Sequence, residues 1–484
     1  MIRWLRRHAL DLSPLRTSRP FALLFWARTV SIAGIGVMAV ALPLQVYGLT
    51  GDSLQVAMVN TVLGIAGLGG ALAGGLVADR RDRRRVILAA RAAAVLGFAI
   101  LAANAFMPEP ALWVFYLCAV IDGVAGGVST TALSAAVPST VQEHQLPATA
   151  ALMAISLDLG MVFSPALGGL LYAAVGPGWL YVWVVVACLA SLALLWRLPA
   201  LEPGVEENDG GGNREAAPAG LLAGLAGAAR TAWTDTREGL VFVVRHRAVG
   251  AVMLLGFIQL LCASPHVLIP EFAERQLGIG PEATGLLYSA PAVGALAATV
   301  ASGWTGRVRR VGRVLTVILV VASLGVLMLG ISGSMALAVA AMALTGVGDV
   351  LAEIFRYSII ARETPDRLLG RVGAVWSAQG TVGDTLGGPL LSLLARLAGP
   401  GGAIALGGAA AAVLTVAVYA TTPELRRLEG AADTMEHDAP GHDDVEHGDT
   451  GHTENGSNEA ARDNAGDAAA SATLARTTTT TQEA

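Results

Sequence analysis

The sequence predicts an all-α integral membrane protein with twelve transmembrane helices in two six-helix halves. Three observations support this fold class: an apolar composition, twelve long apolar runs, and Arg residues gathered in alternate connections. Hydrophobic residues make up 54% of the 484 residues, charged residues make up 14%, and the mean hydropathy is +0.59. Because a soluble globular chain carries about a quarter charged residues, this composition excludes an ordinary soluble enzyme.

Runs long enough to span a bilayer, which takes about 20 mostly apolar residues, occur twelve times. A polar stretch separates the first six from the last six. We expect the helices at 21–47, 55–78, 85–106, 111–136, 148–173 and 178–198, and then at 248–270, 283–305, 313–331, 335–358, 372–396 and 401–421. The first run is longer than a bilayer needs, which permits a tilt or a kink.

The Arg residues predict the orientation, since cytoplasmic connections are enriched in positive charge. Arg clusters occur before the first run and after the second, eighth and tenth runs. The alternate connections at 48–54, 107–110, 174–177 and 332–334 contain no Arg. The pattern predicts a multi-pass protein of the cell membrane with both termini in the cytoplasm.

These runs divide the chain into four regions. We expect an N-terminal half at 1–198, a cytoplasmic linker ending in a surface helix at 199–247, a C-terminal half at 248–422 and a tail at 423–484. Residues 429–484 carry 13 acids and 2 Arg, a net charge of −11, within a whole chain of −5. Such a segment cannot bury enough apolar area to fold, so we predict a disordered acidic cytoplasmic tail.

Four His residues in the tail are spaced by five among acids: His437, His442, His447 and His452. Imidazole and carboxylate groups suit zinc, nickel or copper. A spacing of five does not place them on one helical face, so we interpret the tail as a solvating segment and predict no metal site. A metal-responsive tail on a membrane sensor is the alternative.

Equivalent positions of the two halves share weak similarities in the same order. Both 74–88 and 301–315 place Gly before an Arg cluster. The fifth run has Asp158 before Gly168 and Gly169, and the eleventh has Asp384 before another Gly pair. Two related halves predict a binding cavity at their interface, near the middle of the membrane.

The connection between the second and third helices resembles the loop signature of the major facilitator superfamily. The matching residues are Gly75, Asp79, Arg80, Arg83 and Arg84, and Asp82 stands where the family usually has Gly. The stretch "ADRRDRRR" is most similar to the efflux branch that includes macrolide and siderophore exporters. The resemblance covers about residues 15–422 and implies the major facilitator fold. It also implies that Asp79 lies near the start of the eleventh helix and holds the cytoplasmic side closed in the outward-open state.

The fifth helix resembles the G-x-x-x-G-P-x-x-G-G pattern of exporters in this superfamily. Here the matching residues are Gly160, Pro165, Gly168 and Gly169, with Ser164 in place of one Gly. The resemblance implies antiport; ordinary packing of small residues is the alternative. Proton-coupled drug exporters of the family often have an Arg in the fourth helix, where this chain has Asp122. A coupling scheme built on that Arg is therefore not carried over.

Charged residues inside spanning helices are costly, so each is a candidate for function. A carboxyl group in a dry cavity can take up a proton near neutral pH. We therefore assign Asp122, Asp158 and Asp384 to proton coupling or the cavity, with Arg28 as a charge partner. Asp122 could pair with Arg28 or Arg91, and a structural ion pair is the alternative. Asp349 and Glu353 share one helix face, and we expect one of them to pair with Arg356.

These patterns predict a secondary active transporter that exports a bulky, largely apolar small molecule, such as an antibiotic or other secondary metabolite. Proton antiport and alternating access would drive it. An importer or a lipid translocator on the same fold is the alternative. We expect a monomer in the lipid bilayer with protons as coupling ion, no cofactor, no nucleic acid and no catalytic residue. The sequence has no P-loop, which argues against direct use of ATP.

Overall fold

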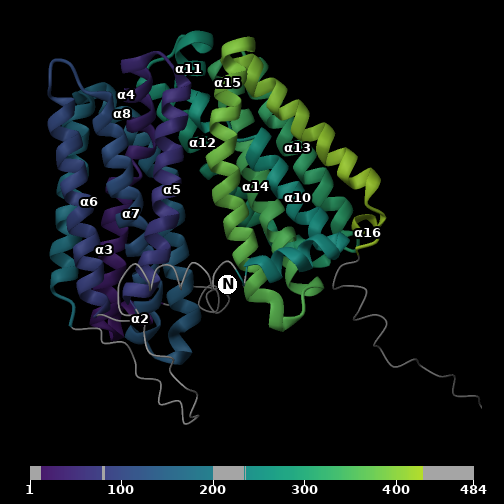
Figure 1. The fold of residues 1–484 in the computed structure, drawn as a ribbon, viewed down its shortest axis with the longest axis horizontal. Coiled ribbons are helices and arrows are strands. Elements are labelled where there is room, and N and C mark those ends of the chain that lie inside the picture. Colours follow the sequence, from purple (N-terminus) through teal and green to yellow (C-terminus); the bar gives the residue numbers. More distant parts are fainter. Residues whose placement is uncertain (1–11, 79–81, 200–233, 235, 429–484) are drawn as a thin grey trace, which may run out of the picture. The chain divides into compact units, whose positions relative to one another are not determined.

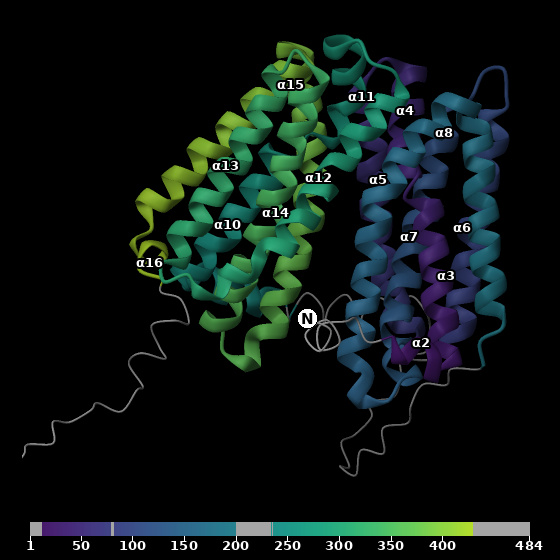
Figure 2. The same cartoon turned by 180° about the vertical axis from the view of Figure 1, so that it is seen from behind.

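A computed structural model of the chain describes residues 12–78, 82–199, 234 and 236–428 (Figure 1). Every regular element within these ranges is a helix. The helices of the first half and those of the second half form two neighbouring bundles, and both views show them side by side (Figures 1 and 2).

The first half begins with a short helix that leads into the membrane-spanning ones. Its elements are α2 (Ser13–Thr17), α3 (Arg19–Ile35), α4 (Met38–Thr50), α5 (Ser53–Ala78), α6 (Arg83–Ala105), α7 (Leu112–Ala136), the 3₁₀ turns η1 (Pro138–Thr140) and η2 (Glu143–Gln145), and α8 (Leu146–Trp196).

The second half begins with a helix at 236–245, which we call the linker helix. Its further elements are α10 (Arg247–Cys262), the 3₁₀ turn η3 (Pro265–Leu268), α11 (Ile269–Phe272), the π-helical turn η4 (Ala273–Leu277), α12 (Pro281–Ala301), the 3₁₀ segment η5 (Ser302–Arg307), α13 (Val311–Ile331), α14 (Met335–Glu363), α15 (Asp366–Thr421) and α16 (Pro423–Arg426).

Twelve membrane crossings are confirmed, although ten helical segments of the described residues are long and apolar enough to span. The difference comes from α8 and α15, which have 51 and 56 residues. At about 1.5 Å per residue, each is more than twice the length that a bilayer core requires. Each therefore supplies two crossings.

Each of these long helices is broken at a Gly that precedes a Pro. Gly176 has φ 78° and ψ 170°, and Gly399 has φ 74° and ψ 166°. This region of φ and ψ is accessible almost only to Gly. The following Pro177 and Pro400 start the next crossing, where their missing N–H costs no hydrogen bond. The breaks lie in the gaps predicted between the apolar runs.

The first and seventh crossings are interrupted as well. α3 and α4 are joined at Gly36, which faces Ser164: a Cβ at Gly36 would lie 2.5 Å from the Ser164 Cβ. The long first run therefore consists of two helices joined by a short turn at residues 36 and 37. The seventh crossing breaks after α10, at Ala263 and Ser264, and Pro265 begins η3.

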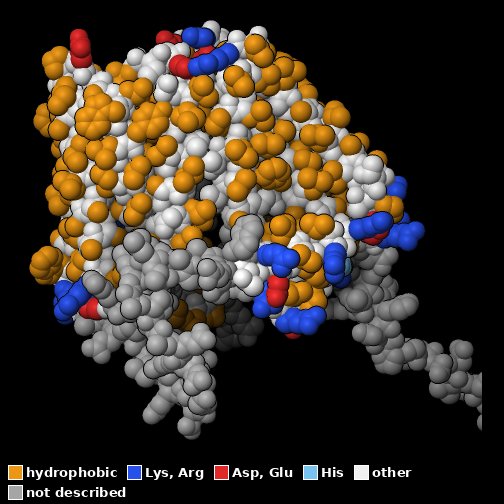
Figure 3. Space-filling view, in the orientation of Figure 1, with side chains coloured by type: hydrophobic (Ala, Val, Ile, Leu, Met, Phe, Trp, Pro, Cys, Tyr) orange, Lys and Arg blue, Asp and Glu red, His pale blue; other side chains and the backbone are white. Residues whose placement is uncertain are grey.

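Large apolar side chains cover the face seen in Figure 3, and charged side chains collect at its two ends. Exposed residues of this kind include Trp113, Trp179 and Leu397. This distribution suits a bilayer, because hydrocarbon surrounds the middle of the molecule and water meets its ends. We call the end that carries residues 48–54 the Asp52 end, and the opposite one the Arg83 end.

The buried core differs between the two ends. One apolar cluster contains residues of both halves, among them Met38 and Val56 of the first and Leu268 and Leu391 of the second. These residues lie toward the Asp52 end. The other clusters are each confined to one half, as with that around Phe355. The halves therefore share a core at one end only.

Two packing features lie near the expected boundaries of these regions. The linker helix covers the last part of 199–247, and its Val243 is buried in the core of the second half. α16 lies just beyond the predicted end of that half at 422, yet its Leu425 is fully buried. Arg247 also donates to Glu424 at 3.0 Å. The packed chain thus reaches at least this turn, and 429–484 lie outside the described residues.

Candidate functional site

A cavity of about 960 Å³ lies between the halves. α5 forms its wall in the first half, and α10, η3, α12, α13, α14 and α15 form its wall in the second. Its lining follows α5 from Ala57 to Leu72, which is roughly 22 Å of helix. Thr236 of the linker helix also lines it. The cavity therefore extends from the shared core toward the Arg83 end.

The two walls differ in chemistry. The α5 wall is made of Ala, Gly and Leu residues with Asn60 as its polar member. The wall of the second half supplies most of the polar groups: Gln259, Ser264, His266, Thr345, Asp349, Ser377, Thr381, Asp384 and Thr385. An apolar cavity with a few converging polar groups is the usual form of a small-molecule site.

Two carboxylates face this cavity. Asp384 lies in α15, where Thr381 and Ser377 occupy the same helix face one and two turns earlier. Asp349 lies in α14, one turn after Thr345. Both Asp side chains are exposed, although each lies within a membrane-spanning helix. The exposure is therefore to the cavity, where water, protons or substrate can reach the carboxylates.

Arg356 contacts other partners, although it also interacts electrostatically with Asp349. It pairs with Glu353 at 3.5 Å, as the spacing in α14 predicts, and its guanidinium lies 4.9 Å from the centre of the Trp376 ring. Gly256 makes room for it, since a Cβ there would lie 2.1 Å from Arg356 Nη2. Arg356 therefore packs inside the second half.

Hydrogen bonds fix two further polar groups of the lining. The Gln259 amide donates to Ser323 Oγ at 3.0 Å and to Thr415 Oγ1 at 3.2 Å. The Tyr288 hydroxyl donates to the His266 carbonyl at 2.7 Å, and the two rings are stacked with centres 6.3 Å apart. Both groups are thus held by neighbouring helices of the second half.

Polar contacts across the halves close the Asp52 end. Arg396 donates to Asp52 at 2.6 Å, and the Ser392 hydroxyl donates to the Ser53 carbonyl at 3.3 Å. Deeper in, the Thr61 hydroxyl donates to the Thr385 carbonyl at 3.0 Å. Asp52 also accepts from the Leu54 N–H at 3.0 Å, so the residue that pairs with Arg396 caps the start of α5 as well.

The predicted motif of the fifth crossing packs α8 against α3, the junction of α3 and α4, and α12. A Cβ at Gly160 would lie 2.1 Å from Ile32 of α3, and one at Gly168 would lie 2.8 Å from the Val37 carbonyl. A Cβ at Gly169 would lie 2.6 Å from the Pro281 carbonyl and 2.7 Å from the Gly285 Cα of α12. Gly169 and Gly285 thus bring the two halves into backbone contact.

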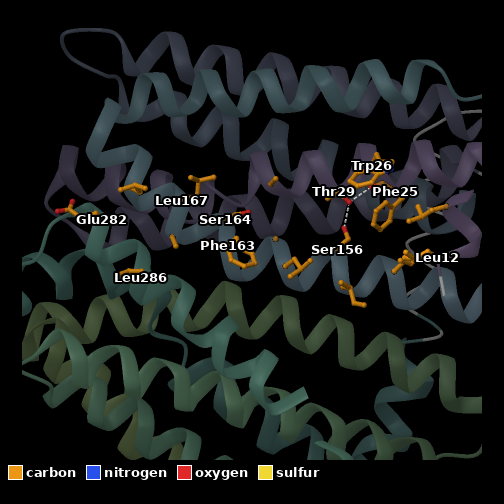
Figure 4. Close-up of a pocket in the computed structure, with 18 of the residues that line it drawn as sticks. Leu12, Phe25, Trp26, Thr29, Ser156, Phe163, Ser164, Leu167, Glu282 and Leu286 are labelled. Carbon is orange, nitrogen blue, oxygen red and sulfur yellow. Dashed lines mark hydrogen bonds between the residues drawn. The ribbon is translucent and has the colours of Figure 1, made fainter. Parts of the chain in front are cut away.

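Beside this motif lies a second, lateral groove of about 1080 Å³. Figure 4 shows its side chains along α3, α8 and α12, from Leu12 at one end to Glu282 at the other. Its lining is apolar except for Glu282, Ser164 and the hydrogen-bonded pair of Thr29 and Ser156, 3.1 Å apart. Gly160 also lines it, so this groove and the motif share residues.

The predicted gating loop is described in part. Gly75 lies half-buried in α5, and Asp79 and Arg80 lie outside the described residues. Arg84 donates to the Trp196 carbonyl at 2.6 Å, and its own N–H donates to Asp82, which caps α6. Arg83 begins α6. Through Arg84, the described part of the loop therefore links the start of α6 to the end of α8 by a hydrogen bond.

Of the other charged candidates, the structure brings Asp122 near Arg91, with which it interacts electrostatically. Arg91 donates to Ser31 at 2.5 Å. Arg28 lies close to Arg91, and its guanidinium contacts the Met153 sulfur at 3.5 Å. These side chains lie inside the first half and are not part of the cavity lining. Asp158 lies on α8, and its side chain is outside the described part of the structure.

Sequence reasoning missed the neutral polar residues of the cavity, in particular Asn60, Thr236, Ser377 and Thr381. A usable signal was present in the eleventh run. Ser377, Thr381 and Asp384 recur at intervals of four and three residues, which places them on one helix face. In a helix surrounded by lipid and protein, such a polar stripe marks the side that faces water.

Comparisons with known proteins agree with this architecture. The sequence profile of the Major Facilitator Superfamily matches residues 24–268 and 252–440. The enterobactin exporter EntS of Shigella boydii serotype 18 is 32% identical over 418 residues, which cover 86% of this chain and 95% of the relative. EntS of Escherichia coli O1:K1 is similar to the same extent.

Solved structures agree in fold. A POT family transporter in complex with 5-aminolevulinic acid has a TM-score of 0.68 at 14% identity, covering 85% of this chain and 97% of that one. The human organic anion transporter MFSD10 has a TM-score of 0.56 at 14% identity, covering 83% and 99%. At these identities the likeness concerns the fold alone. Together with the sequence matches, it shows that this chain belongs to the Major Facilitator Superfamily and is a multi-pass membrane transporter of the efflux type, not an enzyme.

Proposed function

We propose that this protein exports a bulky, largely apolar small molecule by proton antiport, and that the cavity between the halves binds the substrate. One observation carries the proposal: the halves share a core at the Asp52 end only, and the cavity extends from that core toward the Arg83 end. Two bundles that meet at one end can rock about the cavity and meet at the other.

The direction of export follows from the orientation that we propose. The Arg-rich connections support an orientation with the Arg83 end and both termini in the cytoplasm. The cavity would then reach toward the cytoplasm while the outer side is closed by the Asp52–Arg396 pair. An exporter loads its substrate in this state. Because one chain forms the whole cavity, we expect the monomer to be the transporting unit.

Proton coupling is assigned first to Asp384, with Asp349 beside it in the same cavity. A carboxylate that binds either a proton or a substrate exchanges one for the other across the membrane. Asp122, with Arg91 and Arg28, is a second place where a proton could bind, inside the first half. We further propose that Asp79 meets the start of α15 when the cytoplasmic side closes, because a helix N-terminus attracts a carboxylate.

The substrate class that we propose is a secondary metabolite or antibiotic. The relatives named above export enterobactin, which supports a secreted product of comparable complexity. A volume of about 960 Å³ is at the upper end of the range for small-molecule sites. The small residues Gly64 and Gly67 of the α5 wall leave that volume free.

The lateral groove favours a second candidate, the translocation of a lipid. Its apolar lining crosses most of the membrane-spanning length between α3, α8 and α12. An acyl chain could lie there while its headgroup passes. A lipid translocator would move a fluorescent phospholipid between the leaflets of reconstituted vesicles, and replacing Phe163 and Leu167 by Trp would slow that movement. An exporter that uses the central cavity would leave the phospholipid in place.

The test is the susceptibility of an efflux-deficient bacterial host to a panel of macrolides, tetracyclines and catecholate siderophores. We expect selective resistance, with cellular accumulation of that compound restored by a protonophore. Asp384→Asn and Asp79→Asn should abolish resistance at normal expression, and Asp158→Asn reports on the fifth crossing. Glu109→Gln, in a loop at the Asp52 end, is the matched control. The proposal would be contradicted if the protein gave resistance to no compound of the panel, or if the resistance persisted in the presence of the protonophore.

A further inference from the structure

The cavity has an unbalanced charge. Among the lining residues that the structure describes, Asp349 and Asp384 are the acids, and no Arg side chain lines the cavity. His266 is the remaining titratable group of the lining, and imidazole adds positive charge only when it is protonated. Ionised carboxylates in a cavity with low-dielectric walls produce a negative potential that extends over the whole cavity.

The nearest Arg residues along these helices pair with other carboxylates, and Arg356 also interacts electrostatically with Asp349, so it offsets part of that charge. Arg356 is seven residues beyond Asp349, roughly 10 Å along α14, and it is engaged with Glu353 and Trp376. Arg371 is thirteen residues before Asp384, roughly 20 Å along α15, and it pairs with Glu238 of the linker helix. Each Arg therefore has a carboxylate partner outside the cavity.

The other residues of the lining suit the apolar and uncharged polar parts of an amphiphilic ligand. Leu68, Leu72, Val267 and Val326 offer apolar surface, while Asn60 and Gln259 offer hydrogen bonds without charge. Hydrogen bonds to Ser323 and Thr415 already orient the Gln259 side chain. A ligand with an apolar body and one positive group would meet complementary partners at both parts, whereas an anion would face two carboxylates.

We infer that the substrate is an amphiphilic cation, such as a bulky amine, whose charge is neutralised by Asp349 and Asp384. This inference rests on the proposed function, because it takes the cavity as the substrate site, and it narrows the substrate class. Binding of the cation and of protons to the same carboxylates is mutually exclusive, so loading of the cation releases protons into the cytoplasm. Return of protons from outside would displace the cation there.

Two probes of the same shape and opposite charge test the inference: tetraphenylphosphonium and tetraphenylborate. Binding of each is measured separately by calorimetry on the purified full-length chain in detergent micelles, with partition into empty micelles subtracted. We expect the wild type to bind the cation at least about tenfold more tightly than the anion, since the Coulomb energy of one charge pair near a protein surface exceeds the 1.4 kcal/mol that this ratio needs.

Substitutions of the two carboxylates test whether they cause the preference for the cation. Asp349→Asn and Asp384→Asn should each weaken binding of the cation, and the double variant should remove the preference for it. Glu109→Gln, which removes an exposed acid in a loop at the Asp52 end, outside the lining, should bind as the wild type does. Size-exclusion profiles show whether each variant is folded. If the double variant does not fold, the cation preference of the wild type and its loss in the single variants still test the inference. Preference for the anion, or an unchanged preference in the folded double variant, would overturn the inference.

The outcomes separate this inference from the proposed function. If the wild type prefers tetraphenylborate yet still gives protonophore-sensitive resistance in the host, the charge of the substrate is wrong and the export function stands. If it prefers tetraphenylphosphonium through the two carboxylates but gives no proton-linked transport, the binding inference stands and the export function fails.

Discussion

Gly169 and Gly285 determine how closely α8 and α12 approach across the halves. We predict that Gly169→Ala destabilises the protein by about 1–3 kcal/mol, because its Cβ would press on the Pro281 carbonyl and the Gly285 backbone, which cannot rotate away. Thermal unfolding of the purified protein measures the effect, and transport should fall with it. Gly126→Ala, where no atom lies within 4 Å of the added Cβ, should unfold like the wild type. Equal behaviour of the two variants would show that the contact is looser than described.

The sequence identifies charged residues inside the spanning helices but does not by itself show which of them face the cavity. Their cost inside a membrane marked Asp349 and Asp384 as candidates, and both residues line the cavity, although only Asp384 was expected there. The same argument picked out Asp122, which lies inside the first half beside Arg91. Except where polar residues recur on one face, as at Ser377, Thr381 and Asp384, hydropathy gives no direction around a spanning helix, because lipid and neighbouring helices are equally apolar. Only the packing of the twelve helices decides which carboxylate meets the cavity.

The glycine breaks determine where α8 and α15 each turn back across the membrane. We predict that Gly176→Ala and Gly399→Ala each cost about 1–3 kcal/mol of unfolding free energy, since both residues have a positive φ that other residues rarely adopt. No atom lies within 4 Å of either added Cβ, so the cost is a property of the backbone alone. Gly48→Ala, equally open in space but helical, is the control for the thermal unfolding measurement.

These breaks were predictable because Gly-Pro pairs interrupt the apolar runs, as were the positions and number of the crossings. The linker helix was predictable as a helix, and its role was not. It packs on the start of α15 through Gly239, whose Cβ would lie 2.5 Å from the Arg371 carbonyl, and through the Glu238–Arg371 ion pair. Contacts between segments more than 100 residues apart leave no local pattern in a single sequence.

The ion pair between the linker helix and α15 can be tested by exchanging its charges. We predict that Glu238→Arg or Arg371→Glu lowers the transport rate, because each places like charges together at the mouth of the cavity. The double variant Glu238→Arg, Arg371→Glu should recover part of the activity. The pair is exposed, so its contribution to stability should stay below about 1 kcal/mol. A double variant that is worse than either single one would argue against a direct partnership.

At the scale of the whole molecule, the Asp52–Arg396 pair holds the two halves together at one end. We predict that Asp52→Asn shifts the population toward the state that is open at this end, because the amide can still cap α5 but no longer pairs with Arg396. Labelling of a Cys introduced at His266 by a membrane-impermeant maleimide should become faster from the Asp52 side. Glu109→Gln, at the same end, should leave the labelling rate unchanged.

We propose that the cavity exchanges substrate for protons through Asp384. The most direct test of this exchange uses the purified protein in liposomes that are acidic inside, with the compound found in the susceptibility screen. For one-to-one exchange of a proton with a singly charged cation, which moves no net charge, each pH unit supports up to about tenfold accumulation. We predict accumulation that collapses when nigericin removes the pH gradient. Asp384→Asn should exchange substrate without accumulating it, while Glu109→Gln should accumulate it normally. Accumulation that persists without the gradient, or in Asp384→Asn, would contradict the account.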